Sequence, residues 1–568
     1  MTPPINAQAI SLTERLGSAI RTALDAMAED DWIRRIWDQE AELWRSEPEH
    51  VTEIKRRLGW LHLPTRALPK AGMLEEFAGE ARGQFDRVVL LGMGGSSLAA
   101  WCFADIFGPA EGYPELVVLD STVPSEVLAA TGEAPLERCL FIVASKSGTT
   151  SETRSLFDYF WERLCETKGD DAGENVIAIT DPGTPLAELA DRRGLRATFE
   201  NWPDLGGRYS ALSYFGMVPA ALLGLPVRRI LERASEMAAV CAPEVPADQN
   251  PGAALGALLS RAYEAGRDKV TFLTSERMAT FGDWAEQLLA ESTGKDLKGL
   301  VPVVGEPPVE VASYGTDRLF AYIRMGEDDV HDRLAAELAE AGHPVVRIDV
   351  NDSISVGAEM WRWEFATAVA GAVMGINPFD QPDVQAAKDR TKQMLETYRQ
   401  SGALPEMTPD ATDGDMAVYG APGAAEIRHA VDRLLEQAQD GDYFAIMAYL
   451  PRRPVVDDAV ARMRAEVAGG LGIATTFGYG PRFLHSTGQL HKGGANTGVF
   501  LQITGHDAQA VAVPGEPYDF ETLKSAQAQG DFHVLQEKRR RAIRVDLGEN
   551  IDANLGRLTE MIAEAVAD

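Results

Sequence analysis

Short apolar runs alternate with helix-length stretches along a large part of the chain. From Phe85 onward, β-branched runs are centred on Val89, Val118, Ile142 and Ile177, and helix-length segments separate them. Alternation of this kind predicts a parallel sheet with helices on both of its faces. We therefore expect an α/β fold for this part of the chain.

The same alternation returns twice further along the chain. A second unit begins near Asn250, with strand-like runs at residues 270–274, 319–323 and 345–349. A third unit has strand-like runs centred on Ala445, Ala474 and Leu501. The pattern thus predicts two parallel-sheet sandwich domains and an additional C-terminal α/β domain.

The N-terminal region has a different pattern. Its apolar residues, which include Ile20, Leu24 and Met27, recur at helical spacing, so helices are predicted. Three tryptophans, Trp37, Trp44 and Trp60, are expected to anchor these helices on the next domain. We assign this region a packing role.

These patterns divide the chain into five segments. An N-terminal helical segment covers residues 1–75, the first sandwich domain residues 76–245 and the second residues 246–400. Residues 401–422 are rich in Gly, Pro, Asp, Thr and Met and are predicted to be a linker. The C-terminal α/β domain then covers residues 423–568.

Composition narrows the choice of partners. The 568 residues are 45% apolar and 25% charged, as in soluble globular proteins, and the net charge is −32. Such a charge argues against nucleic acid or an anionic membrane as a partner. The first residues show no signal-peptide pattern and no apolar run is long enough to span a bilayer, so we expect a cytoplasmic protein. The four cysteines lack zinc spacing and are expected to be free thiols, mostly buried.

Two loops follow neighbouring strand-like runs and carry the best candidate chemistry. The segment GMGGSS at residues 92–97 contains Gly94 and Gly95, which allow the backbone to approach a ligand closely. The segment SKSGTT at residues 145–150 adds small hydroxyl side chains. Each loop leads into a helix, whose free N–H groups bind anions. Together the loops predict a site for a phosphate monoester.

A dinucleotide site is the alternative for the first loop. Its fingerprint needs a third glycine where Ser97 stands, although Asp120 at the end of the next strand-like run would suit that cofactor. A dinucleotide fold has no need for the second loop. Two hydroxyl-rich loops at one sheet edge fit a compact phosphate better.

Other charged residues have both a functional and a structural interpretation. Arg208, in a Gly-Gly-Arg turn, could face a ligand or lie in a surface loop. Glu291, on the last turn of a predicted helix, could be a general base or a solvated helix end. Lys388 could be a solvated helical lysine. His485 and His491 flank a glycine turn without further metal ligands, which leaves an acid–base role or ordinary loop histidines.

Five segments together resemble the phosphoglucose isomerases. They are GMGGS (92–96), SKSGTT (145–150), GGRYS (206–210), ESTGK (291–295) and NPFDQPDVQAAK (377–388). The resemblance covers roughly residues 85–395 and implies that the two sandwich domains are sugar-isomerase (SIS) domains. It further implies an aldose–ketose isomerase without metal or other cofactor, and a homodimer.

The resemblance also implies roles for individual residues. The sugar phosphate would be held by Gly94, Gly95, Ser96, Ser145, Ser147 and Thr150, with backbone N–H groups around Lys146. Glu291 would move the proton between C1 and C2, and Arg208 would stabilise the enediolate. Gln381 and Lys388 would face the substrate, Lys388 at the ring oxygen.

One segment is displaced from its usual position. Bacterial members carry a Leu-His-Ser-x-Gly-Gln segment shortly after the catalytic glutamate, and its histidine helps to open the sugar ring. Here LHSTGQ occurs at residues 484–489, beyond Lys388, as in the isomerase portion of transaldolase–isomerase fusions. His485 is therefore the candidate for ring opening, and His491 is the second choice.

The predicted reaction is the interconversion of glucose 6-phosphate and fructose 6-phosphate through an enediol. One alternative is an isomerase that also accepts mannose 6-phosphate. Another is a non-catalytic SIS-type regulator that only binds a sugar phosphate. The sequence shows no basic recognition helix, which such a regulator would need to bind DNA.

Overall fold

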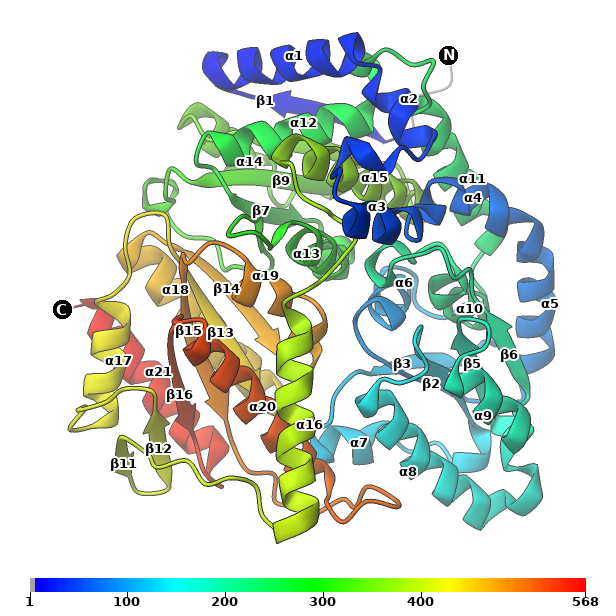
Figure 1. The fold of residues 1–568 in the computed structure, drawn as a ribbon, viewed down its shortest axis with the longest axis vertical. Helices are drawn as coiled ribbons and strands as arrows, with labels where there is room; N and C mark the ends of the chain where they lie inside the picture. Colours follow the sequence, from blue (N-terminus) through cyan, green and yellow to red (C-terminus); the bar gives the residue numbers. More distant parts are fainter. Residues whose placement is uncertain (1–5, 568) are drawn as a thin grey trace.

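The computed structural model describes residues 6–567, which contain three β-sheets, each flanked by helices (Figure 1). The predicted α/β class, with two parallel-sheet sandwich domains and a third α/β domain, is confirmed. The three predicted units correspond to the three sheets. In this part of the chain, no helix combines the length and apolar character needed to cross a membrane.

The first sheet is entirely parallel, with strand order β3-β2-β4-β5-β6. Its strands are β2 (Arg87–Gly92), β3 (Glu115–Leu119), β4 (Cys139–Ala144), β5 (Val176–Thr180) and β6 (Ala197–Glu200). The helices of this domain are α6 (Leu98–Phe107), α7 (Pro124–Ala129), α8 (Ser151–Lys168), α9 (Pro185–Arg193) and α10 (Tyr214–Leu222). Strand β6 was not predicted, because it is short and only one of its four residues is buried.

The second sheet has strand order β1-β10-β9-β7-β8. Its parallel strands are β7 (Lys269–Thr274), β8 (Val301–Val303), β9 (Arg318–Met325) and β10 (Val345–Val350). The helices around it are α11 (Val227–Val240), α12 (Pro251–Glu264), α13 (Ala279–Thr293), α14 (Asp332–Glu340) and α15 (Val356–Met374). Helix α15 is buried on almost every side and forms the centre of the core.

The N-terminal region differs from the prediction of helices alone. Strand β1 (Ala7–Ser11) pairs antiparallel with β10, at the edge of the second sheet. Helices follow it: α1 (Glu14–Glu29), α2 (Trp32–Trp37), α3 (Pro48–Lys55), α4 (Leu63–Ala67) and α5 (Ala71–Ala81). The Trp44 indole N–H donates to the Ala368 carbonyl of α15 at 2.8 Å. The tryptophans thus fix this region mainly to the second sandwich domain.

The third sheet has strand order β11-β12-β16-β15-β13-β14. Its parallel strands are β13 (Tyr443–Tyr449), β14 (Ala474–Tyr479), β15 (Gly498–Thr504) and β16 (Arg541–Asp546). The accompanying helices are α16 (Val384–Ser401), α17 (Ile427–Leu435), α18 (Pro454–Leu471), α19 (Gly488–Gly493), α20 (Phe520–Glu537) and α21 (Ile551–Ala567). Helix α16 packs along α20, between the first and third domains (Figure 1).

The segment predicted as a linker contributes to the third sheet. Within residues 401–422, β11 (Ala411–Asp413) and β12 (Met416–Tyr419) form a hairpin that pairs antiparallel with β16. The turn-rich composition hid these strands, because each is short and the hairpin turn at Gly414 lies between them. The linker prediction is therefore corrected at this hairpin.

Buried polar contacts fix the third domain to the second. The Glu306 carboxylate accepts hydrogen bonds from Arg318 at 2.9 Å and from the Thr475 backbone N–H at 2.7 Å. Arg464 of α18 donates to the Gly305 carbonyl at 2.8 Å. Because breaking a buried network of this kind leaves charges without partners, the two domains are held in one arrangement. This arrangement positions the LHSTGQ segment.

The cysteine prediction is also confirmed. Cys102, Cys139 and Cys241 are buried, Cys165 is partly exposed, and all four are free thiols.

Candidate active site

Most of the predicted site residues line one cavity of about 280 Å³, which we call the central cavity. Its walls come from all three domains and from the N-terminal region. Of the predicted residues it contains Gly94, Gly95, Ser96, Lys146, Ser147, Thr150, Arg208, Glu291, Gln381, Lys388 and His485. Ser145 and the second-choice histidine, His491, do not line it.

Two loops at the carboxyl ends of adjacent parallel strands form one wall. The first follows β2 and the second follows β4, and these strands pair with Gly92 opposite Ala144. A Cβ atom on Gly95 would lie 2.1 Å from the Gly207 carbonyl oxygen. Gly94 has φ +55°, and a Cβ there would meet the His485 carbonyl at 2.6 Å. The glycines therefore let the loop approach two other walls of the cavity as well as a ligand.

The second loop uses its hydroxyl groups unequally. The Ser145 hydroxyl is buried, accepts a hydrogen bond from the Gly148 N–H at 3.1 Å and bonds to the Thr150 hydroxyl at 3.0 Å. Ser145 thus shapes the loop, whereas Ser147 is exposed at the cavity. The Lys146 ammonium forms an ion pair with Asp181. Helix α8 begins at Ser151 with no side-chain cap, which leaves its first N–H groups free to bind an anion.

The Arg208 guanidinium is buried and held from several sides. It donates to the Ser292 hydroxyl at 2.7 Å, to the Pro378 carbonyl at 2.6 Å and to the Gln381 side chain at 3.0 Å. Its Nη1 lies 3.5 Å from Oε2 of Glu291. The arginine therefore has a fixed orientation beside the glutamate.

Glu291 lies on the last turn of α13, with its side chain 11% exposed. The Gln287 amide, one turn earlier on the same face, donates to Glu291 at 3.2 Å. The same amide donates to the His485 carbonyl at 2.8 Å. Gln287 therefore links the glutamate to the LHSTGQ segment.

The His485 imidazole is held by a buried carboxylate. Its Nε2 lies 2.9 Å from Oε1 of Glu152, and Gln527 of α20 donates to the same oxygen at 2.8 Å. Thr122 in turn donates to the Gln527 side chain at 2.9 Å. Burial favours the neutral carboxyl, but the imidazole outweighs it and lowers the pKa of Glu152 to about 2. Glu152 is thus ionised at neutral pH and orients the histidine.

His491, six residues later, has a very different environment. It is buried among the rings of Tyr443, Phe483 and Phe500, and its Nδ1 has no hydrogen-bond partner. Burial and the neighbouring cations lower its pKa well below the usual range. This histidine therefore belongs to the core of the third domain.

The loop before α16 is held by Lys295. The Lys295 ammonium donates to the Asn377 carbonyl at 2.7 Å and to the Asp380 carboxylate at 2.7 Å. Burial and the nearby Arg208 lower the pKa of Lys295 to about 8. Helix α16 begins at Val384, so Lys388 lies in its second turn, exposed at the cavity mouth.

Three residues that sequence reasoning missed contribute to this site. Glu152 follows the second loop directly, and Gln287 lies four residues before Glu291, so both were within reach of a helical-face argument. Arg57 also lines the cavity, and it comes from the N-terminal region to which we assigned only packing. It donates to Glu53 at 2.8 Å and to the Leu205 carbonyl at 3.3 Å. No sequence signal marks Arg57.

The site contains groups for binding an anion and for moving a proton. Within residues 6–567, no three His, Cys, Asp or Glu side chains are grouped closely enough to hold a metal ion. The arrangement provides a fixed cation beside a carboxylate, a carboxylate-held imidazole and two loops with free donors. These are components of acid–base chemistry on a phosphorylated substrate.

Comparisons with known proteins identify the family. The family model described as phosphoglucose isomerase matches residues 66–316. A probable glucose-6-phosphate isomerase of Natronomonas pharaonis is 30% identical over 382 residues, covering 60% of this chain and 86% of the relative. The glucose-6-phosphate isomerase of Carboxydothermus hydrogenoformans is 29% identical over 399 residues, covering 60% of this chain and 85% of the relative.

Solved structures agree in fold. A glucose-6-phosphate isomerase from Chlamydia trachomatis aligns with a TM-score of 0.53 at 18% identity, covering 66% of this chain and 86% of that chain. A hypothetical protein from Thermus thermophilus aligns with a TM-score of 0.58 at 25% identity, covering 68% of this chain and all of that chain. By its sequence similarity and its fold, this chain belongs to the phosphoglucose isomerase family and is an aldose–ketose isomerase.

Proposed function

We propose that this chain interconverts glucose 6-phosphate and fructose 6-phosphate, with Glu291 moving a proton between C2 and C1. The strongest support is the position of the Glu291 carboxylate. It lies 3.5 Å from the buried Arg208 guanidinium, in a cavity walled by two anion-binding loops. The names of the relatives support the same pair of sugar phosphates.

The phosphate binds at the loops after β2 and β4. Ser96, Ser147 and Thr150 line that wall, and the free N–H groups at the start of α8 add positive potential. Arg57, which pairs with Glu53, also lines the cavity and adds a cation. Holding the phosphate there orients the sugar for reaction at its other end.

Ring opening uses His485 and Lys388. The Glu152 carboxylate keeps the His485 imidazole in place, so the ring can take or give a proton at the anomeric hydroxyl or the ring oxygen. Lys388 at the cavity mouth is the second proton carrier.

Proton transfer then uses Glu291 and Arg208. Glu291 takes the C2 proton of the open aldose and returns it to C1, while the hydroxyl proton on O2 passes to O1, and the reverse reaction uses the same carboxylate. The enediolate charge is stabilised by Arg208, whose orientation is already fixed by its hydrogen bonds. An arginine stays protonated throughout, so it does not compete for the migrating proton.

We further propose that His485 serves the cavity of its own chain. The expected homodimer is then not needed to complete the site, because the buried contacts of Glu306 and Arg464 hold the histidine segment in place. The specific activity should therefore stay constant on dilution to nanomolar enzyme. A fall in specific activity as a dimer dissociates would contradict this.

The test of the reaction is a label-transfer assay. With glucose 6-phosphate deuterated at C2, a single carboxylate base delivers part of the deuterium to C1 of the product, which NMR detects. Product formation without any label at C1 would contradict a proton shuttle by Glu291. Absence of turnover with bound substrate would favour a regulator, and turnover of mannose 6-phosphate in the same assay would favour the dual isomerase.

A further inference from the structure

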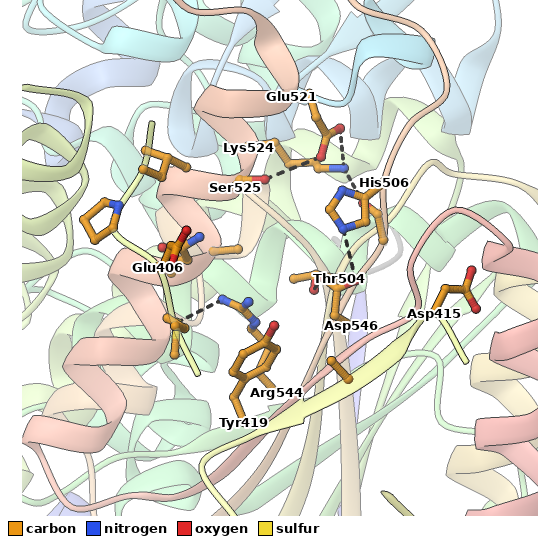
Figure 2. A pocket seen from close by; sticks show the side chains of 17 residues that line it. Glu406, Asp415, Tyr419, Thr504, His506, Glu521, Lys524, Ser525, Arg544 and Asp546 are labelled. Atoms are coloured by element: carbon orange, nitrogen blue, oxygen red, sulfur yellow. Dashed lines mark hydrogen bonds and ion pairs between the residues drawn. The ribbon is translucent and has the colours of Figure 1, made fainter. Parts of the chain in front are cut away.

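A second cavity, of about 430 Å³, lies within the third α/β domain, and we call it the Arg544 cavity (Figure 2). It is at the carboxyl ends of β15 and β16, where Thr504 and Asp546 are the last strand residues. Ligands bind at this edge of parallel sheets. None of the residues given a role in the reaction lines this cavity.

Arg544 is the unusual residue of this cavity. It is only 6% exposed, yet its hydrogen bond goes to the Met407 sulfur at 3.4 Å. The guanidinium lies over the Tyr419 ring, 4.3 Å from the centroid, and its Nε has no partner. By contrast Arg541, in the same strand, has an ion pair with Asp442. Among residues 6–567 no carboxylate lies within ion-pair distance of Arg544, although the Asp546 charge and the Tyr419 side chain act on it. The guanidinium therefore keeps donors for an external anion.

The opposite wall is polar but internally paired. Lys524 donates to the Gly505 carbonyl at 2.7 Å and pairs with Glu521 at 2.8 Å. His506 pairs with Asp546 at 3.2 Å. In Figure 2 Glu521, Lys524 and His506 form a group apart from Arg544 and Tyr419.

Two further acceptors line the cavity and suit the neutral polar part of a ligand. The side-chain carbonyl oxygen of Gln529 is buried without a hydrogen-bond partner, and Glu406 also lines the cavity. A hydroxyl-bearing molecule would donate to these acceptors while its anionic group binds Arg544. An apolar ligand would leave them unsatisfied.

We propose that the Arg544 cavity binds a small hydroxylated anion, a phosphate monoester or a carboxylate, and that its occupancy alters turnover in the central cavity. Helix α20 joins the two sites. Ser525 and Gln529 line the Arg544 cavity, and between them Gln527 donates to Glu152, the carboxylate that holds His485. A shift of α20 on binding therefore acts on the histidine. The effect on turnover rests on the proposed function, whereas the binding does not.

Calorimetric titration of the full chain with inorganic phosphate tests the binding. The central cavity also binds phosphate, so Ser147→Glu is used to place a negative charge in its anion-binding loop. The wild type should bind two phosphates per chain, and the Ser147→Glu and Arg544→Gln variants one each. Arg541→Gln, the matched control in the same strand, should bind two. Equal phosphate binding by Arg544→Gln and the wild type overturns the proposal.

A second variant covers the case in which Arg544→Gln unfolds. Gln529→Glu places a carboxylate at a partly exposed position of the cavity wall and should weaken phosphate binding in the Ser147→Glu background at least tenfold. Citrate in place of phosphate distinguishes a carboxylate ligand from a phosphorylated one. If Ser147→Glu binds neither phosphate nor citrate, the site is refuted, whatever the outcome for the reaction.

Kinetics tests the effect on turnover. Phosphate should compete with substrate at the central cavity, which raises KM, and should change kcat through the Arg544 cavity. Only the change in kcat should disappear in Arg544→Gln, whose turnover without added anion should equal that of the wild type. Identical phosphate inhibition of the wild type and Arg544→Gln refutes the effect on turnover. A label-transfer result that contradicts the Glu291 shuttle does not affect the binding test.

Discussion

The central cavity and the Arg544 cavity differ in how their arginines are held. Arg208 is held by segments that are distant in the sequence. It donates to Ser292 of α13 and to the Pro378 carbonyl before α16, and it faces Glu291. Arg544 lies within one domain and has an aromatic ring and a sulfur atom as neighbours. The first cation is oriented before any ligand arrives, whereas the second has donors that only a ligand would use.

This difference indicates two kinds of function. Stabilising a charge that develops during a reaction requires a cation already fixed by the protein, because reorientation at that moment would raise the barrier. Binding an anion that is already charged requires only unused donors in a closed space. The predictions below test this division, in order of their expected effect on turnover.

The largest effect is expected for Glu291→Gln. Removing the base while keeping its shape should lower kcat by about 10²–10⁴-fold with little change in KM, because the phosphate is held elsewhere. Steady-state assays of both variants should show this loss for Glu291→Gln and none for Arg544→Gln. Near-normal turnover of Glu291→Gln would remove the distinction between the two cavities.

The two histidines that flank the glycine turn, His485 and His491, should respond in opposite ways. His485→Ala should lower turnover of cyclic glucose 6-phosphate by about 10–10²-fold. Turnover of an open-chain aldose phosphate should fall much less, because ring opening is the lost step. His491→Ala creates a cavity in an aromatic cluster, so it should lower the unfolding temperature by several degrees and change turnover little. The reverse pattern would make His491 the functional residue.

A smaller effect is expected for Glu152→Gln, which keeps the shape of the carboxylate that orients His485. Turnover should fall about tenfold, with the loss again confined to cyclic substrate. The folded pKa of Glu152 is lowered to about 2, so its stabilising contribution is present above the unfolded value near 4.5 and is lost as the pH falls toward 2. The unfolding temperatures of the wild type and Glu152→Gln should therefore converge in acid and differ at neutral pH. An equal loss of turnover on open-chain substrate would argue against a role in ring opening.

Much of this fold could be predicted from hydrophobic pattern, since central parallel strands such as β4 are continuous apolar runs. Some edge strands could not, although the edge strands β3 and β14 were predicted. Strand β1 pairs with β10, more than 300 residues away, and carries alternately exposed residues that resemble a loop. The hairpin of β11 and β12 also has few buried residues, so its hydrophobic pattern is weak. The formation of β1 and of this hairpin depends on pairing with strands that are distant in the sequence. The local hydrophobic pattern does not contain that information.

The central cavity could be predicted where a short segment contains its own chemistry, as for Glu291 and the two loops. Arg57 could not be predicted, because its place depends on contact with Leu205 across the chain. Ser145 was predicted to hold phosphate, but its hydroxyl bonds to Gly148 and Thr150 within the loop. The Arg544 cavity has no sequence pattern at all. It is recognised because Arg544 has no ion pair within residues 6–567, and this can be seen only in the folded chain.

Little effect on turnover is expected for Glu286→Gln, which tests the support beneath His485. Glu286 is buried, and the Ser486 hydroxyl donates to it at 3.3 Å. Burial, reinforced by Asp283, raises its pKa to about 8. The folded pKa exceeds the unfolded value near 4.5, so the stabilising contribution is complete below 4.5 and is lost as the pH rises through 8.

Glutamine stays neutral, so the variant should not lose this stability. Chemical unfolding should differ by less than about 1 kcal/mol at pH 5 and should favour Glu286→Gln by about 4 kcal/mol at pH 8. Turnover should change less than twofold, because Glu286 does not line the central cavity. A variant that is less stable than the wild type at pH 8 would show that Glu286 is ionised there. The histidine segment would then be supported by a buried charge, as the central cavity is by Arg208, rather than by a neutral carboxyl group.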